Sequence, residues 1–337
     1  MAALGTGLPN IVDLAKRQDP DGKIAGIIEI LAQQNTLMAD APFMACNDGT
    51  THLTTLRTQM PAVYWGKINL ATSWSKSDTA QIREGTGFIR QYSGVDVTLA
   101  EISGDVNGFR LSESQAVMEA MRQEAEATFF YGNAGTAPEE FNGLAVRYNA
   151  LSTSTSPAAA NVINAAGTED SPSDLTSIWL VSWGENNVHA LVPKGVPGGL
   201  RHDNLGRQLI QSSTTLGAMA SLTMFVDEYR WFMGLALRDW RSAGRVANID
   251  ISDRLAATDS VLPAFVRRLI ASAHLPGNKV LYMNRNTAYL FNEECFRDVK
   301  GGGGLTFANV GGENIASFQG IPIHITDGIL STESAVA

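Results

Sequence analysis

A stretch between Thr50 and Ile102 constrains the fold of this chain more than any other feature. It is rich in Thr, Val, Ile, Tyr and Trp, and turn signals stand at residues 76–78 and 84–87. Such residues favour β-strands, and the turn signals predict a long hairpin or ribbon. Two strands alone are only marginally stable in water, so we expect another surface to cover this ribbon.

The ribbon carries side chains that we predict to form an interface between copies of the chain. It holds two tryptophans, each able to bury about 150–250 Å². Indoles exposed on an isolated subunit promote aggregation, so we expect a neighbouring copy to cover at least one. We expect the cations to meet carboxylates across that boundary, which steers register more than it adds affinity. The residues are Trp65, Lys67, Trp74, Lys76, Arg83 and Arg90.

An apolar helical stripe precedes the ribbon. Its residues recur at the spacing of one helix face, after an Asp-Pro-Asp-Gly turn signal at 19–22. The stripe predicts an arm that lies on a neighbouring copy, or equally a helix packed on the chain's own core. We include its residues in the predicted interface: Ile24, Ile27, Ile28 and Leu31.

A helix over residues 112–131 is the best-defined element. Ser112 and Gln115 match a capping box at its start, and Gly132 suits the position after its end. At 1.5 Å per residue its length is about 30 Å. Its acidic side predicts a solvated face. The predicted buried stripe consists of Val117, Met121, Ala125 and Phe129.

Residues 133–174 are rich in small and polar types and predict a surface loop. Apolar runs at 178–183 and 188–192, separated by Gly-Glu-Asn-Asn, then predict a hairpin. Residues 231–237 predict a buried strand.

The last part of the chain alternates helix and strand. Helices are predicted over 262–273 and 287–296, strands over 279–283 and 321–325, and a joint at the glycines 301–304. Pro322 predicts an edge position for the last strand, because proline donates no hydrogen bond to a neighbour.

Composition narrows the possible functions. Charged residues make up 18% of the chain, below the usual value of about 25%, which suggests that partners cover some of the surface. A net charge of −9 argues against a dedicated nucleic-acid binder. Loose contact between a few arginines and nucleic acid is compatible with this net charge.

Motifs for catalysis and for metal or nucleotide binding are absent from the sequence. Cys46 and Cys295 are far apart and are expected to be small buried side chains in a reducing compartment. No two histidines have helical metal-site spacing, and His189 and His324 are expected to be hydrogen-bonded structural histidines. The sequence contains no P-loop, zinc-protease or nucleophile-elbow motif. We therefore expect no enzyme, no cofactor and no metal site. We also expect no signal peptide or membrane span, hence synthesis in the cytoplasm.

The order of the elements, with several short motifs in sequence, carries a resemblance. The motifs stand at residues 13–17, 19–23, 24–31, 141–144, 181–184, 234–239, 282–285 and 320–323. The chain resembles major capsid proteins of tailed bacteriophages with the Hong Kong 97-type fold, and most of all those of short-tailed phages of the epsilon-fifteen group.

The resemblance implies an α+β fold with four parts. These are an N-terminal arm (1–48), an E-loop β-ribbon (49–102), a P-domain with its spine helix at 112–131 (103–250), and an A-domain (251–337). It implies pentamers and hexamers that form an icosahedral shell around double-stranded DNA, assembled in the bacterial cytoplasm. A separate scaffolding protein, a portal and a decoration protein are implied partners. Some relatives cross-link an E-loop lysine, for which Lys67 and Lys76 are the candidates here.

Two alternatives stay open from the sequence. One is an encapsulin-like compartment, which shares the fold but encloses an enzyme. The other is a cytosolic hydrolase with dispersed Ser, His and Asp residues.

Overall fold

The computed structural model describes residues 36–154, 156–167, 174–213, 219–256, 259, 261–272, 277–297, 305–310 and 313–337. The predicted arm helix, with Ile24, Ile27, Ile28 and Leu31, and the glycines 301–304 lie outside these residues. The described chain forms two compact units. The smaller unit contains residues 88–126 and 198–232, and the larger unit contains residues 36–87, 127–197 and 233–337.

The smaller unit packs helix against strand around a small apolar cluster. Strand β7 (Leu200–Ser213) runs antiparallel to the first part of β8 (Met219–Leu237). The cluster joins the end of β3 (Asp78–Asp96) to α3 (Val97–Ile102) and the start of α4 (Val106–Tyr131). Its buried members are Val95, Leu99, Ala100 and Phe109.

The long helix α4 starts earlier than the sequence suggested. It begins at Val106, where the carboxylate of Asp105 accepts a hydrogen bond of 2.9 Å from the Gly108 amide. The capping box predicted at Ser112 is therefore wrong, since Ser112 lies inside the helix. An aspartate is as good an N-cap as a serine, and here the earlier cap brings Phe109 into the cluster of the smaller unit.

The buried stripe of α4 is confirmed for three of its four residues. Met121, Ala125 and Phe129 are buried, and Val117 is half-buried. The spacing of four thus identified the correct face of the helix.

The larger unit is built on a mixed sheet whose strands follow the order β11-β12-β13-β10-β5-β6. Strand β9 pairs with β5, β4 pairs with β9, and both β1 and the end of β8 pair with β6. The strands are β1 Phe43–Ala45, β4 Val162–Asn164, β5 Leu175–Trp183, β6 Val188–Val192, β9 Ala243–Asp250, β10 Asn278–Met283, β11 Leu305–Val310, β12 Glu313–Phe318 and β13 Ile321–Ile325.

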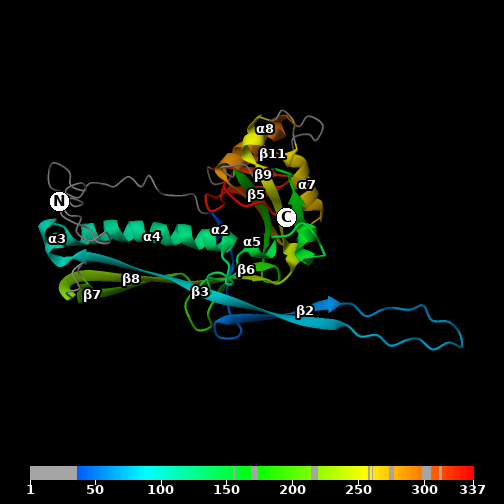
Figure 1. The fold of residues 1–337 in the computed structure, drawn as a ribbon, viewed down its shortest axis with the longest axis horizontal. Helices are drawn as coiled ribbons and strands as arrows, with labels where there is room; N and C mark the ends of the chain where they lie inside the picture. The colour runs from blue at the N-terminus through cyan, green and yellow to red at the C-terminus, as the bar shows by residue number, and fades with distance from the viewer. Residues whose placement is uncertain are drawn as a thin grey trace. The chain divides into compact units, whose positions relative to one another are not determined.

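Short helices surround this sheet (Figure 1). They are α2 Leu37–Asp40, α5 Leu144–Arg147, α6 Ile251–Ala256, α7 Leu262–Ser272 and α8 Arg285–Arg297, with 3-10 turns at Pro157–Asn161 and Trp240–Ser242. The helices and strands predicted for the last part of the chain are confirmed. The stretch expected to be a loop, 133–174, contains α5, a 3-10 turn and β4 among its described residues.

Two strand pairings differ from the sequence-based expectation. Strands β5 and β6 do not form a hairpin, because they share only one parallel contact, between Trp183 and Val188. All nine residues of β5 are buried, and the strand pairs antiparallel with β9 and β10 instead. Strand β13 is not at an edge, since it lies between β10 and β12. Its pairing with β10 begins at Ile323, after Pro322.

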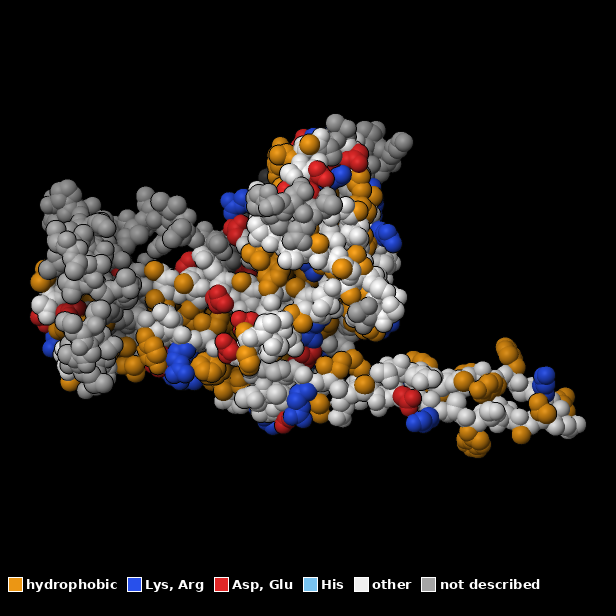
Figure 2. Space-filling model, in the orientation of Figure 1, with side chains coloured by type: hydrophobic (Ala, Val, Ile, Leu, Met, Phe, Trp, Pro, Cys, Tyr) orange, Lys and Arg blue, Asp and Glu red, His pale blue; other side chains and the backbone are white. Residues whose placement is uncertain are grey.

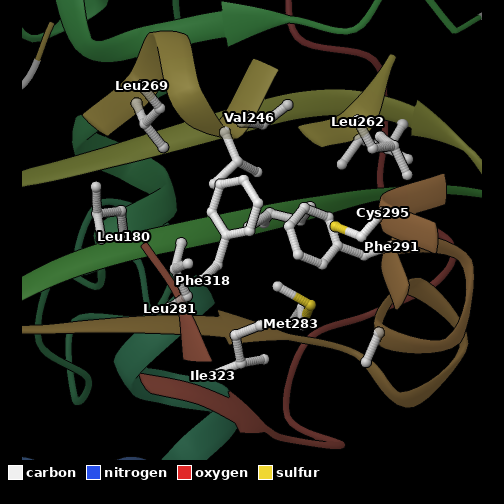
Figure 3. Packing of buried hydrophobic residues seen from close by; sticks show 14 of the residues in the cluster. Leu180, Val246, Leu262, Leu269, Leu281, Met283, Phe291, Cys295, Phe318 and Ile323 are labelled. Carbon is white, nitrogen blue, oxygen red and sulfur yellow. The ribbon is translucent and has the colours of Figure 1, made fainter. Parts of the chain in front are cut away.

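The main core of the larger unit lies between the sheet and the helices α7 and α8 (Figure 3). The rings of Phe291 and Phe318 stand edge to face at its centre, 5.1 Å apart. Leu180 and Leu281 contribute from the sheet, and Leu262 from α7. This packing gives the larger unit a substantial core of its own.

The ribbon predicted near residue 50 is a hairpin of β2 (Thr51–Gln59) and β3, which lie side by side in Figure 1. The predicted turn at 84–87 is wrong, since these residues continue β3. The ribbon also ends earlier than predicted, at Asp96, where α3 begins. The connection between the two strands covers residues 60–77.

Candidate functional site

The connection between β2 and β3, hereafter the projecting loop (residues 60–77), has few contacts with the rest of its unit. Its bend lies at Ile68 and Asn69, where the Leu70 amide donates to the Lys67 carbonyl at 3.2 Å. Asn69 adopts a positive φ of 65°, which asparagine tolerates better than most residues. The tip expected at residues 76–78 is therefore wrong, because residues 76 and 77 end the projecting loop and Asp78 begins β3.

The projecting loop exposes large apolar side chains. Trp65 is 99% exposed and Ile68 94%, and Trp74 is fully exposed. Figure 2 shows hydrophobic side chains standing out along this loop, at the right of the view. The other large apolar side chains exposed on it are Met60, Val63, Tyr64 and Leu70. Such a concentration is typical of a surface that is covered in an assembly.

The predicted cations of the ribbon mostly have carboxylate partners within the subunit. Lys76 lies 3.1 Å from Asp78, and Arg83 lies 3.4 Å from Asp48. In the smaller unit, Arg90 lies 3.8 Å from Glu228. Lys67, at the bend, has no ion pair among the residues described.

The pairs of Lys76 and Arg83 are exposed and therefore contribute only about 0–1 kcal/mol, and the pair of Arg90 with the buried Glu228 is long at 3.8 Å. They do not prevent an exchange of partners on assembly. They show that pairing across a boundary is not needed to satisfy Lys76, Arg83 or Arg90. Among the described residues, Lys67 is the one predicted ribbon cation without an ion pair, so its ammonium group is available to a neighbour.

Buried polar residues hold the base of the hairpin on the sheet of the larger unit. Glu84 on β3 accepts two hydrogen bonds from Arg147, at 2.5 and 2.8 Å. His52 on β2 stands edge to face with His189 on β6, with ring centroids 5.5 Å apart. Arg238 lies 3.2 Å from the Nε2 atom of His52. The hairpin is thus anchored at one end and free at its loop.

Burial lowers the pKa of both histidines and so favours their neutral forms. It lowers the pKa of His189 to about 4, and the charges of Arg238 and His52 act in the same direction. Burial also lowers the pKa of His52, with Arg238 lowering it further and Glu84 opposing. No local pattern in the sequence indicates this pair, because 136 intervening residues separate the two histidines and only the fold brings them together.

The smaller unit contains a second polar cluster, around Asp227. Arg110 donates to both carboxylate oxygens of Asp227, at 2.8 Å, and the Nε2 atom of His202 lies 2.9 Å from the same group. His202 also stacks on Tyr229 at 4.8 Å. These residues line a pocket of about 390 Å³.

Ser114 lines the same pocket, so Ser, His and Asp side chains do occur together. The hydroxyl of Ser114 donates to the Arg110 carbonyl at 2.8 Å, one turn earlier in its helix. Its hydrogen bond therefore serves the helix backbone and not the imidazole of His202. The arrangement lacks the contact by which a base activates a nucleophile.

A third cluster fixes the C-terminal segment to the sheet of the larger unit. Arg245, on β9, donates to Glu333 at 2.8 Å and lies over the ring of Trp179 at 5.0 Å. Tyr131 and Ser177 donate to Glu333 as well. Both charged groups are almost fully buried, so this cluster serves the fold.

The described residues contain no group of three or more His, Cys, Asp or Glu side chains that could hold a metal ion. Cys46 and Cys295 are free and buried. Burial raises the pKa of the Cys46 thiol. His324 contacts the Asp40 carboxylate at 2.6 Å, as expected for a structural histidine. No helix in the described ranges is long and apolar enough to cross a membrane.

Over its full length the chain is similar to a chain in the near-atomic structure of bacteriophage Epsilon15, with 31% sequence identity and a TM-score of 0.79. The match covers 100% of this chain and 99% of that one. The capsid of bacteriophage JBD30 gives a TM-score of 0.42 at 11% identity, covering 80% of this chain and 87% of that chain.

The encapsulin complex of Synechococcus elongatus gives a TM-score of 0.42 at 8% identity, covering 72% of this chain and 96% of that chain. None of the curated proteins compared with the chain matches it. The family described as Major capsid protein GP7 matches residues 19–337. The chain therefore belongs to the GP7 family of phage major capsid proteins, with the Hong Kong 97-type fold expected from its sequence.

Proposed function

We propose that this major capsid protein works as a purely structural subunit and that copies hold one another through the projecting loop. The subunits assemble as pentamers and hexamers into an icosahedral shell around double-stranded DNA. The observation that carries the proposal is the projecting loop, whose apolar side chains lack cover in the single subunit. A closed shell requires surfaces of this kind, which reach from one copy to the next.

Trp65 and Trp74 are the main anchors of this interface. Both indoles are fully or almost fully exposed, and tryptophan is enriched among residues that dominate binding energy. The stripe of Ile24, Ile27, Ile28 and Leu31 is a second proposed contact, supported by its helical spacing in the sequence. Lys67 supplies a cation at the bend for a carboxylate of the neighbour.

We assign the parts of the subunit as for other capsid proteins of this fold. The N-terminal arm is residues 1–48, the E-loop 49–102, the P-domain 103–250 and the A-domain 251–337. Within the E-loop, the structure describes the hairpin with its projecting loop, and α4 is the spine helix.

Further partners follow from the role in a phage head. We propose a separate scaffolding protein, a portal and a decoration protein, together with non-specific contact with packaged DNA. Assembly takes place in the cytoplasm of the bacterial host. Cross-linking through Lys67 or Lys76 is not favoured, because lysines on ribbons commonly serve solubility.

Removing the anchors tests the proposal. Trp65→Ala and Trp74→Ala should leave the subunit folded, because neither indole contributes to its core. Both should weaken or block the formation of closed shells. Circular dichroism would measure folding, and electron microscopy would show the assembly products.

The matched control is Phe296→Ala, which removes an aromatic ring that is 74% exposed on α8, outside the loop. Shells of this variant should form normally. Normal shells from both tryptophan variants would contradict the proposal. Unfolded subunits would mean that the loop contributes to the subunit's own core, which would contradict the exposure of its side chains.

A further inference from the structure

The outer edge of β2 carries backbone groups that no neighbouring strand satisfies. In the described part of the chain, β2 pairs only with β3. The side-chain amide of Asn47 takes the place of a further strand at one position. It accepts a hydrogen bond from the Leu53 amide and donates one to the Leu53 carbonyl, both at 2.8 Å. The N–H and C=O groups of Leu53 therefore face away from β3.

Alternation along the strand extends this observation to the next residues. In an antiparallel pair, every second residue points its backbone groups at the partner strand and the others point them outward. Since Leu53 points outward, Thr55 and Arg57 do so too, up to the register shift between Arg57 and Gln59. Both residues are exposed. Among the described residues, Asn47 caps only Leu53, and the edge stays open at Thr55 and Arg57.

A groove runs beside this open edge. Its volume is about 770 Å³, and β2 lines it from Leu53 to Arg57, together with Met60. The remaining lining residues come from the turn between β5 and β6, at Asn186, and from residues 238–241 after β8. Leu53, Leu56 and Met60 give the groove an apolar part.

The groove is also cationic. Three arginines line it, namely Arg57, Arg238 and Arg241, whereas Asp239 is the single acidic residue in its lining. Arg241 binds Asp239 at 2.7 Å, and Arg238 donates to Asn186 at 3.1 Å. Arg57 has no ion pair within the described ranges. An occupant with carboxylates would complement this charge, in a protein with 34 acidic and 25 basic residues.

We propose that an extended, acidic segment of a second copy of this chain adds to β2 as a further strand, at Thr55 and Arg57. Strand addition uses unpaired backbone groups for affinity and side-chain pockets for specificity, and this groove offers both. Soluble proteins usually protect such edges, so an edge left open beside a lined groove fits a built docking site.

A second copy is the favoured occupant because the protein functions in a shell of many copies. Strand β2 also leads directly into the projecting loop, so a neighbour that covers the loop passes close to this edge. In this respect the inference rests on the proposed function.

Hydrogen exchange tests the inference on the unmodified protein. In dissociated subunits, the amides of Thr55 and Arg57 should exchange quickly, and those that face β3 more slowly. In assembled shells, exchange at Thr55 and Arg57 should slow at least about tenfold, because a new strand occupies both amides. Equally fast exchange in shells and subunits would overturn the inference. If the protein formed no shells at all, the proposed function would fail instead.

A pair of variants at Thr55 gives a second test. Thr55→Pro removes the outward N–H group and leaves the hydrogen bonds to β3 in place, since proline is tolerated where the amide faces away. Thr55→Val keeps the N–H group and is the matched control. We expect folded Thr55→Pro subunits, by circular dichroism, that assemble into fewer shells than Thr55→Val subunits. Equal yields from the two variants would count against strand addition.

A photo-reactive amino acid in place of Thr55 identifies the occupant. Irradiation of assembled shells should give cross-links to peptides of a second copy, visible as dimers on a denaturing gel. Mass spectrometry of the dimer should place the link on an acidic segment. Cross-links to a different protein, or only within one chain, would overturn the choice of occupant.

Discussion

At the scale of single residues, the larger unit places opposite charges where water hardly reaches them. Arg245 and Glu333 have side chains that are 5% and 4% exposed, and they contact at 2.8 Å. Ser177 and Tyr131 satisfy further oxygen sites of the carboxylate, and Trp179 covers the guanidinium. A buried pair of this kind adds little net stability, but an unpaired buried charge costs a great deal.

The consequence is a strong asymmetry between single and double substitutions. Arg245→Met leaves the Glu333 carboxylate buried without its cation, and should lower the free energy of unfolding by about 3–5 kcal/mol. The double variant Arg245→Met with Glu333→Gln should recover much of this loss. Urea denaturation of the dissociated subunit would measure both. Arg241→Met is the control, since it breaks an exposed pair worth about 0–1 kcal/mol.

The histidine pair at the base of the hairpin predicts how stability depends on pH. The pKa of His189 is about 4 in the folded chain, well below the value of about 6.5 expected in the unfolded chain. Between these values the unfolded state binds more protons, so stability is complete above about pH 6.5 and falls as the pH drops towards 4. Full protonation would remove about 3 kcal/mol.

Unfolding experiments at pH 7 and pH 4.5 would measure this loss. His189→Leu should make stability less dependent on pH, with His52 as the remaining contributor. The charges facing the pair are Arg238, which opposes protonation, and Glu84, which favours it at His52. A pH profile of His189→Leu identical to that of the unmodified chain would refute the assignment.

At the scale of elements, local patterns predicted which face of a helix is buried better than they predicted strand partners. The spacing of four in α4 identified Met121, Ala125 and Phe129 correctly, because helix periodicity is a property of the element itself. The pairing of β5 could not be predicted in this way. Its partners β9 and β10 lie far along the chain, and loop closure alone favours the nearby β6.

In the candidate site, too, local features could be predicted from the sequence and long-range arrangements could not. The sequence predicted that Trp65 and Trp74 stand on a ribbon, and both are exposed there. Residues 76–78 carry good turn residues but lie where the projecting loop meets β3, since turn propensity does not fix which turn closes a hairpin. The groove beside β2 has lining residues from three separate segments, so no local pattern could have shown it.

Two alternative caps for α4 can be compared directly. Asp105→Ala removes the side chain that accepts from the Gly108 amide and should cost about 1 kcal/mol of stability. Ser112→Ala should have little effect or stabilise slightly, because the buried Ser112 hydroxyl has no hydrogen-bond partner among the described residues. Thermal unfolding of both variants would decide. A larger loss for Ser112→Ala than for Asp105→Ala would restore the capping box as the helix start.

At the scale of the whole molecule, the chain builds its core and its apolar surface from different parts. The core around Phe291 and Phe318 lies in the larger unit, away from solvent. The projecting loop concentrates exposed apolar side chains on a segment that contributes nothing to that core. A charged fraction of only 18% is consistent with extensive surface that becomes covered on assembly.

The six tryptophans of the chain allow the buried core and the exposed apolar surface to be distinguished in solution. Trp179 and Trp183 are buried, Trp231 and Trp240 are half-buried, and the two of the projecting loop are exposed. Acrylamide should therefore quench a large part of the fluorescence of dissociated subunits. In shells the quenchable fraction of the fluorescence should be smaller, and the emission should shift to shorter wavelength, because neighbours cover the loop indoles.

The variant Trp65→Phe with Trp74→Phe assigns this change to the loop. Phenylalanine keeps an apolar ring, so this variant should still assemble, whereas the alanine variants should not. Its subunits should be quenched less than the unmodified ones, and assembly should alter the quenching little. Equal quenching of unmodified subunits and shells would mean that the loop stays open to solvent in the particle. The projecting loop would then not be the contact by which one copy holds the next.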